Sequence, residues 1–417
     1  MDRRDEKKMR FNTKLLHGES VKQYPYHATI PPISQVTAFQ FDSAEAQEKV
    51  FTHRASGYAY SRVGNPTVAA FEQRINELEG GNAAIACSSG MSAIALAMLN
   101  MLVSGDEVIA GSGLYGGTID LFRDLRNFGI GVKFVRHVTP EEMEPLINER
   151  TKLIYAEVIG NPGLDVLDIR AVSELAHSRG IPLMVDATTA TPYLVQPLRL
   201  GADIVIHSSS KYINGGGNSI SGVIVDGASF KWDFRRYPAL SDFSRYGPLA
   251  YTIRLRTDTW ENMGCCLSPF HAFMNVNGLE TLGLRMERIC SNAEKIAGAL
   301  SELPGIQVNY PLLPDNPYRE LAMKQFGGRG GGILTFRAGS REKAFRVLNH
   351  LKYIVKASNI GDVRTLAIHP ASTLYINSDE ERRHAAGVYE DTIRISTGIE
   401  DAEDLIEDLT ESIVAAG

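Results

Sequence analysis

Short apolar runs alternate with segments of helical period between about residue 65 and residue 271. The apolar runs have the length of buried strands and are AAIAC, DEVIAG, VKFVR, KLIYAEV, PLMVDA, ADIVIHSS and GVIVDG. Helical segments lie between them, among them GMSAIALAMLNML and a stretch near residues 169–179. This alternation predicts an α/β domain in which a largely parallel sheet carries helices on both faces.

The two flanking regions have other patterns. Residues 1–64 hold a charged start followed by a proline- and aromatic-bearing stretch, 24–41, with little helical period, which predicts an extended arm that packs on another subunit. Residues 272–417 contain helical segments (LETLGLRMERI, AEKIAGALSEL and DLIEDLTESIVAA) and the strand-like GGILTFRA and DTIRISTG. We therefore expect an arm (1–64), an α/β domain (65–271) and a smaller C-terminal α+β domain (272–417).

Composition excludes several classes of protein. The net charge of -6, with 44% hydrophobic and 22% charged residues, favours neither disorder nor nucleic-acid binding. The longest apolar stretch, 93–103, is interrupted by Asn100 and falls short of the roughly 20 residues that cross a membrane, so it predicts a buried helix. The charged start, MDRRDEKKMR, lacks the apolar core of a signal peptide, which favours a cytoplasmic location. The four cysteines form no CxxC pair, so neither a metal site nor a disulfide framework is indicated.

Polar residues follow three of the predicted strands. Glu157 follows LIYA, Asp186 follows PLMV, and the run 207–211 follows DIVI. Ligands of open α/β sheets lie beyond the carboxyl ends of the strands, so these residues mark the expected site.

Lys211 stands out within this set. An isolated lysine is usually a solvated surface charge, but this one follows an apolar strand, ends the run Ser208-Ser209-Ser210-Lys211, and precedes three glycines at 215–217. A lysine in that setting is desolvated enough to supply a neutral amine for an imine with pyridoxal 5'-phosphate (PLP). A nucleotide P-loop is excluded, because the glycines of a P-loop precede its lysine, whereas the glycines here follow Lys211.

Other residues complete a PLP site. Asp186 can keep a pyridinium nitrogen protonated, although an aspartate there is equally a helix N-cap. The segment 87–91 leads into a helix, whose free N–H groups form a phosphate site. Tyr115 can stack on a pyridine ring, and Arg62, beside Tyr60, can hold phosphate by two hydrogen bonds. Taken alone, each of these short motifs more often forms a turn than a ligand site.

Ordered motifs along nearly the whole chain resemble the Cys/Met-metabolism family of PLP enzymes, which includes cystathionine γ-synthase, cystathionine lyases, methionine γ-lyase and O-acetylhomoserine sulfhydrylase. The motifs are YSRVGNPT (60–67), LEGG (78–81), SSGMSA (88–93), LYGGT (114–118), NP (161–162), VDATTATPYL (185–194), HSSSKY (207–212), LETLGLRMER (279–288), GDVRTLAIHPAST (361–373) and RISTGIE (394–400). The resemblance implies the type I, aspartate aminotransferase-like fold of PLP-dependent transferases.

The resemblance also implies a role for each matching residue. Lys211 would bind PLP covalently, Asp186 would pair with its ring nitrogen, and Tyr115 would stack on the ring. The phosphate would contact Ser89, Gly90, Met91, Thr188, Ser208 and Ser210, with Tyr60 and Arg62 reaching it from a neighbouring subunit. Arg394, with Asn161 and Ser358, would bind the substrate α-carboxylate, and Tyr60 and Glu157 would also contact substrate. The enzyme would then be at least a dimer, and the family is usually tetrameric.

Several stretches resemble the O-acetylhomoserine sulfhydrylases more than the lyases, among them LYGGT and GCCLSPFHAF (264–273), and Gly117 stands where methionine γ-lyases usually carry cysteine. The implied reaction is γ-replacement on O-acetylhomoserine by sulfide or methanethiol, giving homocysteine or methionine and acetate. Methionine or homocysteine γ-elimination and use of O-succinylhomoserine, as by a succinyl-dependent sulfhydrylase or cystathionine γ-synthase, remain alternatives.

Three departures from the family pattern, Ala187, Thr189 and Gly216, remove polar or aromatic groups expected near the cofactor. They leave open a protein of another class, one with the PLP fold and no catalysis. Retention of Lys211 and Asp186 speaks against it.

Overall fold

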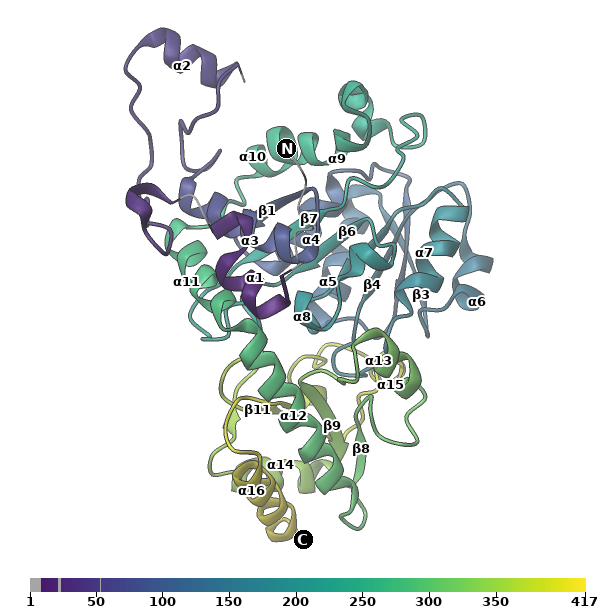
Figure 1. Ribbon diagram of the computed structural model, residues 1–417. Coiled ribbons are helices and arrows are strands. Elements are labelled where there is room, and N and C mark those ends of the chain that lie inside the picture. The colour runs from purple at the N-terminus through teal and green to yellow at the C-terminus, as the bar shows by residue number, and fades with distance from the viewer. Residues whose placement is uncertain (1–8, 22–23, 53) are drawn as a thin grey trace.

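A computed structural model describes residues 9–21, 24–52 and 54–417. The charged start, residues 1–8, on which the expected location depends, lies outside the described residues. Two sheets organise the chain, a seven-stranded one and, toward the C-terminus, a five-stranded one (Figure 1). The helices are α1 (Phe11–His17), α2 (Ala44–Phe51), α3 (Pro66–Glu79), α4 (Gly90–Leu99), α5 (Gly116–Leu125), α6 (Pro140–Met143), α7 (Ile169–Ser178), α8 (Thr191–Leu194), α9 (Ala250–Arg254), α10 (Trp260–Met263), α11 (Pro269–Glu280), α12 (Leu282–Ser301), α13 (Arg319–Gln325), α14 (Arg341–His350), α15 (Glu380–Ala385) and α16 (Ala402–Ala415).

The larger sheet has the order β1-β7-β6-β5-β4-β2-β3. Its strands are β1 (Ala83–Cys87), β2 (Glu107–Gly111), β3 (Gly131–Val135), β4 (Thr151–Glu157), β5 (Leu183–Asp186), β6 (Ile204–His207) and β7 (Gly222–Asp226). Strands β3, β2, β4, β5 and β6 run parallel, whereas β7 is antiparallel to both of its neighbours. The α/β prediction with a largely parallel sheet is confirmed, and each predicted strand is present.

Successive residues of each central strand enter two different apolar cores. On one face, Val185 packs with α3, α7, α11 and α12. On the other face, Met184 and Tyr155 pack with α4, α5 and α9. Both faces are covered, which explains why the strands are continuous apolar runs instead of alternating ones.

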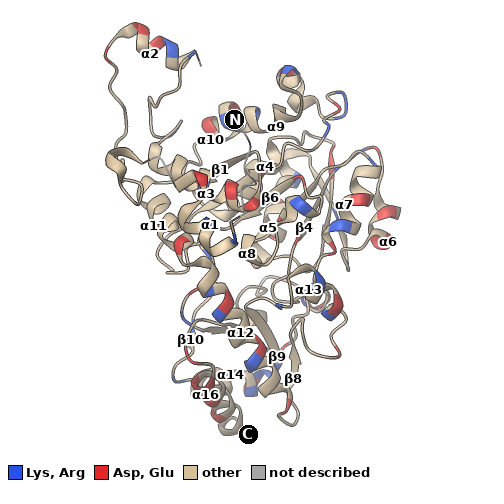
Figure 2. Ribbon diagram, viewed as in Figure 1, with Lys and Arg blue, Asp and Glu red and all other residues tan. Residues whose placement is uncertain are grey.

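The smaller sheet has the order β10-β11-β12-β9-β8. Its strands are β8 (Gln307–Asn309), β9 (Ile333–Arg337), β10 (Val355–Lys356), β11 (Leu366–Ile368) and β12 (Thr392–Ser396). Helix α12 runs from the larger sheet down to the smaller one, where α14 and α16 pack on its apolar core (Figure 1). The predicted smaller α+β part of the fold is thus present. Figure 2 shows acidic and basic residues interspersed along α12, while α6 carries the acidic Glu141 and Glu142.

The N-terminal segment projects from the body. Helix α2, which the sequence pattern did not predict, lies away from the two sheets at the end of extended backbone (Figure 1). Residues 24–41 form no α-helix and contain a single 3-10 turn at Pro25–His27; the expected contact of the arm with another subunit stays a prediction. Among the described residues, no helix has the length and apolarity needed to span a membrane.

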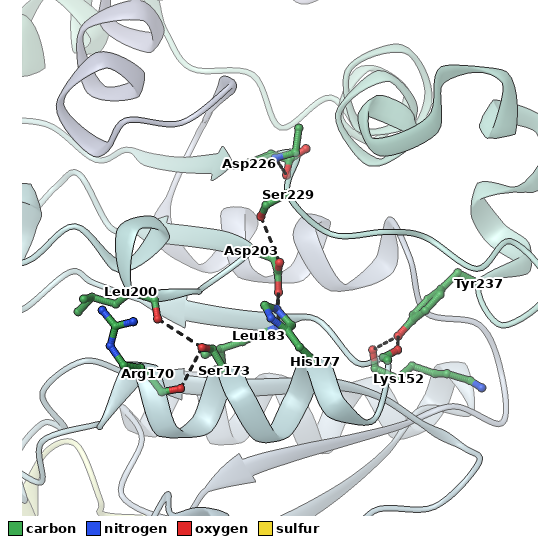
Figure 3. Close-up of polar contacts among 12 residues, drawn as sticks. Lys152, Arg170, Ser173, His177, Leu183, Leu200, Asp203, Asp226, Ser229 and Tyr237 are labelled. Atoms are coloured by element: carbon green, nitrogen blue, oxygen red, sulfur yellow. Dashed lines mark hydrogen bonds and ion pairs between the residues drawn. The ribbon is translucent and has the colours of Figure 1, made fainter.

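The edge of the larger sheet at which the parallel strands begin carries a structural cluster around Asp203 (Figure 3). The buried Asp203 carboxylate accepts hydrogen bonds from the Leu183 N–H (2.9 Å) and the Ser229 hydroxyl (3.2 Å), and pairs with the His177 ring at 2.9 Å. These contacts hold α7 against β5 and β6. The opposite edge of the sheet, at which the parallel strands end, is the one that carries the candidate site residues.

Candidate active site

The opposite edge opens into a cavity of about 420 Å³, within the range of about 300–1,000 Å³ typical of ligand sites. Every site residue expected from the sequence lines this cavity except Tyr60 and Arg62. The residues come from the ends of β4, β5 and β6, from the starts of α4 and α5, and from β12. The converging residues are Ser89, Gly90, Met91, Tyr115, Glu157, Asn161, Asp186, Thr188, Ser208, Ser210, Lys211, Ser358 and Arg394.

Lys211 follows β6 in a turn and projects into the cavity. Its Nζ donates a 2.5 Å hydrogen bond to Oδ1 of Asn359. Burial, together with the charge of the nearby Arg394 guanidinium, lowers the pKa of Lys211 to about 8. A lysine with that pKa has a substantial fraction of neutral amine near neutral pH, which is the form that reacts with an aldehyde and accepts protons.

Asp186 and Glu157 are register partners at the ends of β5 and β4, so their carboxyl groups lie side by side. Asp186 is 7% exposed and accepts hydrogen bonds from the Thr188 N–H (2.9 Å) and the Tyr155 hydroxyl (3.3 Å). Burial raises the pKa of Asp186, and burial together with the Asp186 charge raises the pKa of Glu157 to about 8. The pair therefore favours a positive ligand group beside it.

The polar groups at the start of α4 form a cup that suits a phosphate, and we call it the phosphate cup. Ser89 caps the helix through a hydrogen bond from the Ser92 N–H (3.0 Å), so the first N–H groups of α4 point at the cavity with no intrahelical acceptor. A Cβ atom at Gly90 would lie 2.6 Å from Cβ of Ser208, so only glycine lets the two segments approach this closely. The Ser210 hydroxyl donates to the Ser221 carbonyl oxygen (3.0 Å), a bond with which phosphate would compete.

Arg394 lies on β12 and is 2% exposed. Its Nη1 donates to Oδ1 of Asn161 (3.1 Å) and its Nη2 to the carbonyl oxygen of Asn359 (2.8 Å). Its Nε has no hydrogen-bond partner among the described residues. A buried guanidinium with an unused donor fits a carboxylate ligand, which a guanidinium binds through two parallel hydrogen bonds.

Asn359 is the contributor that sequence reasoning missed. It follows Ser358, which was expected to bind substrate, and contacts both cations of the cavity: its side chain accepts from Lys211 and its backbone from Arg394. The signal available in the sequence was its position two residues before the GDVRTLAIHPAST motif.

Two of the three departures from the family pattern lie away from the cavity lining. Ala187 is fully buried in the core on the α3 and α7 face, and the Gly216 N–H donates to the Asn214 side chain (3.1 Å). Thr189 lines the cavity and donates its hydroxyl proton to the Ile159 carbonyl oxygen (3.0 Å). The lysine, the buried aspartate and the arginine are therefore left in place.

Tyr60 and Arg62 lie outside this cavity. Nη1 of Arg62 donates to the Glu261 carbonyl oxygen (2.9 Å), and the Arg62 guanidinium lies over the Tyr60 ring at 5.5 Å from its centre. Their expected contact with phosphate in a neighbouring subunit stays a prediction.

A family model described as "Cys/Met metabolism PLP-dependent enzyme" matches residues 12–414. The chain belongs to this family. Its cofactor is PLP, and the buried carboxyl pair, the helix N-terminus and the low-pKa lysine fit the ring nitrogen, phosphate and aldehyde of that group.

Curated relatives of this PLP-dependent enzyme include an O-acetyl-L-homoserine sulfhydrylase of Thermus thermophilus, which is 39% identical over 97% of this chain and 100% of the relative. A homocysteine synthase of Schizosaccharomyces pombe is also 39% identical, over 97% of this chain and 98% of its own. A crystal structure from Campylobacter jejuni, named as an O-acetylhomoserine (thiol)-lyase and holding a pyridoxyl-lysine phosphate, matches with a TM-score of 0.92 and 34% identity, covering 97% of this chain and 100% of its own. The predicted family, type I fold and cofactor are confirmed.

Proposed function

We propose that the enzyme catalyses γ-replacement on O-acetyl-L-homoserine, with sulfide as the nucleophile, to give homocysteine and acetate. The observation that carries the proposal is the bridge of Asn359 between Lys211 and Arg394, because it places a proton-accepting amine at a fixed distance from a carboxylate-binding group. Relatives named for this reaction, 37–39% identical over nearly the full chain, support the substrate.

When bound, PLP supplies an electron sink for negative charge that develops on the substrate carbons. Asp186 would hold a positive charge on the cofactor ring, and the start of α4 would hold its phosphate. Arg394 and Asn161 would bind the α-carboxylate and thereby direct the Cα–H bond toward Lys211. The Lys211 amine would take the Cα proton and return it, since its pKa of about 8 suits both steps near neutral pH.

Tyr115 and Glu157 would act where acetate departs. The Tyr115 side chain is 40% exposed at the cavity mouth, and its backbone N–H donates to Oε1 of Glu157 (2.8 Å). Its ring would cover the substrate and exclude water. Glu157, whose pKa is raised by burial and by Asp186, would be a neutral carboxylic acid at neutral pH and so able to donate a hydrogen bond to the acetyl oxygen.

Product analysis tests the reaction. The purified holoenzyme is incubated with O-acetylhomoserine with and without sulfide, and homocysteine, acetate and 2-oxobutyrate are measured. Homocysteine and acetate in equal amounts are expected. Release of 2-oxobutyrate in place of homocysteine would make the enzyme a γ-lyase, and reaction only with the succinyl ester would change the donor.

We propose further that two subunits share each active site, because Tyr60 and Arg62 lie outside the cavity of their own chain, and that two such dimers form a tetramer. Mixing two inactive variants tests this: a chain with Arg62→Ala and a chain with Lys211→Ala would together regain part of the activity, since hybrid dimers hold one intact site. The absence of any regain in verified hybrids would refute a shared site. The four unpaired cysteines support a reducing compartment, which accords with the proposed cytoplasmic location.

A further inference from the structure

A second, smaller cavity lies behind Glu157. Its volume is about 50 Å³, and its wall includes Gly113, Gly160, Asp165 and Tyr318. None of these four residues lines the active-site cavity. We call this cavity the rear chamber.

A thin wall separates the rear chamber from the active site. Glu157 lines both cavities. On one side of it, Leu114 faces the chamber and its neighbour Tyr115 faces the active site; on the other side, Gly160 faces the chamber and Asn161 the active site. The Tyr115 N–H holds Oε1 of Glu157 at 2.8 Å. Glu157 is thus shared by the walls of both spaces.

The size of the rear chamber decides what it can hold. A cavity needs about 10–15 Å³ to accept one water molecule, so 50 Å³ accommodates a few molecules of that size. An amino acid such as O-acetylhomoserine or homocysteine is too large. The chamber therefore selects a di- or triatomic molecule over either of the larger reactants.

The charged groups around the rear chamber are of both signs. Arg136 and His137 lie exposed at its rim, and both of their backbone N–H groups donate to Oε2 of Glu142 (2.9 Å each). Asp165 lies deeper, where burial raises the pKa of its carboxyl group while His137 lowers it. Since neither sign dominates, the chamber suits a small uncharged molecule better than a free ion.

We propose that the rear chamber admits and holds sulfide, as hydrogen sulfide, and delivers it past Glu157 to the substrate while the front of the active site is covered. The proposal rests on the proposed use of sulfide as the nucleophile. It explains how a small nucleophile reaches the reacting carbon of the substrate while the substrate itself and Tyr115 fill the open side of the active-site cavity. It also favours sulfide over methanethiol, because the added methyl group fills more of the chamber.

Filling the rear chamber tests the proposal. At Gly113 a new Cβ atom would meet, within the part of the chain that the structure describes, only Oδ2 of Asp165, at 3.9 Å, and the backbone there is compatible with any side chain. Gly113→Val should therefore fit and occupy the chamber. The expected result is a KM for sulfide raised at least about fivefold, with the KM for O-acetylhomoserine within about twofold of the native value and the absorbance of lysine-bound PLP unchanged. Gly113→Ala should give a smaller change in the same direction.

Gly298→Val is the matched control, since Gly298 lies on α12, outside both cavities, and no atom of the described residues lies within 4 Å of its Cβ position. Its KM for sulfide should equal that of the native enzyme. The proposal is overturned if Gly113→Val and Gly113→Ala retain PLP with a native KM for sulfide, or if the KM for methanethiol rises as much as that for sulfide. A native enzyme that forms no homocysteine would instead refute the proposed function, which separates the two failures.

Discussion

The Lys211 amine and the Asn359 side-chain oxygen are 2.5 Å apart, although 148 residues separate them in sequence. Lys211 lies in the turn after β6 of the larger sheet and Asn359 in a loop of the C-terminal part, so the contact joins the two parts across the cavity. A neutral amide at this place orients the amine without adding charge, which leaves burial and Arg394 to set the lysine pKa.

Asn359→Asp should move the pH dependence of the reaction. A carboxylate beside Lys211 favours the ammonium form and so raises the lysine pKa, by about one to three units from its present value near 8. Because the proton-accepting form is the neutral amine, the rise of kcat with pH should shift upward by the same amount. Asn359→Gln, which keeps an amide, should leave the midpoint of the profile in place. An unshifted profile in Asn359→Asp would mean that the amine does not contact this residue during turnover.

Gly90→Ala should weaken PLP binding without unfolding the enzyme. The new Cβ would lie 2.6 Å from Cβ and 2.8 Å from Oγ of Ser208, so the start of α4, which forms the phosphate cup, must move away from Ser208. We expect the dissociation constant of PLP to rise about tenfold or more, equivalent to at least about 1.4 kcal/mol. Titration of the apoenzyme, followed by absorbance, measures it. Native affinity in this variant would place the phosphate elsewhere.

Gly117→Cys should change the balance between replacement and elimination. A Cβ atom at residue 117 would lie 2.6 Å from Cε1 of Tyr115, so any side chain there displaces the ring from its present position. With the ring displaced, water should reach the site and the ratio of homocysteine to 2-oxobutyrate should fall. Gly117→Ala separates the steric effect from that of the thiol: an equal fall in both variants assigns the effect to the ring, and an unchanged ratio in both would show that the ring position does not control the outcome.

Arg394→Lys should impair substrate binding more than folding. Lysine keeps the charge but cannot bind Asn161 and a carboxylate together through a planar fork. Loss of a buried, charged hydrogen bond costs about 2–5 kcal/mol, so kcat/KM should fall by about 30-fold or more. The absorbance of lysine-bound PLP should be native. Steady-state kinetics with O-acetylhomoserine at fixed sulfide checks both expectations, and a native kcat/KM would remove Arg394 from the carboxylate site.

The central part of the fold was predictable because both faces of the sheet are buried. Each strand is then a continuous apolar run, and Asp186 and Lys211 stand out as polar residues at the ends of such runs. The same property hides strand direction: GVIVDG resembles its parallel neighbours, yet β7 is antiparallel to β6 and β1. The direction of a strand is set by the segments that connect it to its neighbours, and the apolar run itself carries no information about them.

Asn359 and the arm were harder to predict, for different reasons. Asn359 lies in a loop with no apolar period, and its role arises only when the C-terminal part docks on the larger sheet. In the arm, α2 contains no buried residue, so its sequence lacks the wide apolar face from which a helix is recognised. The change at Ala187 seemed relevant to the cofactor because it follows Asp186, but alternation along the strand turns it to the opposite face.

His177 provides a stability prediction that is independent of the active site. Its side chain is 41% exposed and pairs at 2.9 Å with Asp203, which raises the pKa of His177 above its usual 6.5 (Figure 3). A histidine whose pKa is raised on folding stabilises the protein fully below its unfolded-state pKa, and this contribution disappears as the pH rises through the folded-state pKa.

His177→Gln should therefore lower the free energy of unfolding at mildly acid pH and have little effect in alkali. We expect a loss of about 1 kcal/mol near pH 5.5, because solvent screens the half-exposed pair, and this loss should decline as the pH rises through the raised pKa of His177. Urea unfolding of both proteins at several pH values measures the difference. His350→Gln is the control, since among the described residues the His350 ring bonds only the Arg346 carbonyl oxygen of its own helix. A loss that is constant with pH would show that packing of the ring, and not its charge, connects α7 to the sheet. A loss that grows with pH would reverse the sign of the linkage and contradict a raised pKa for His177.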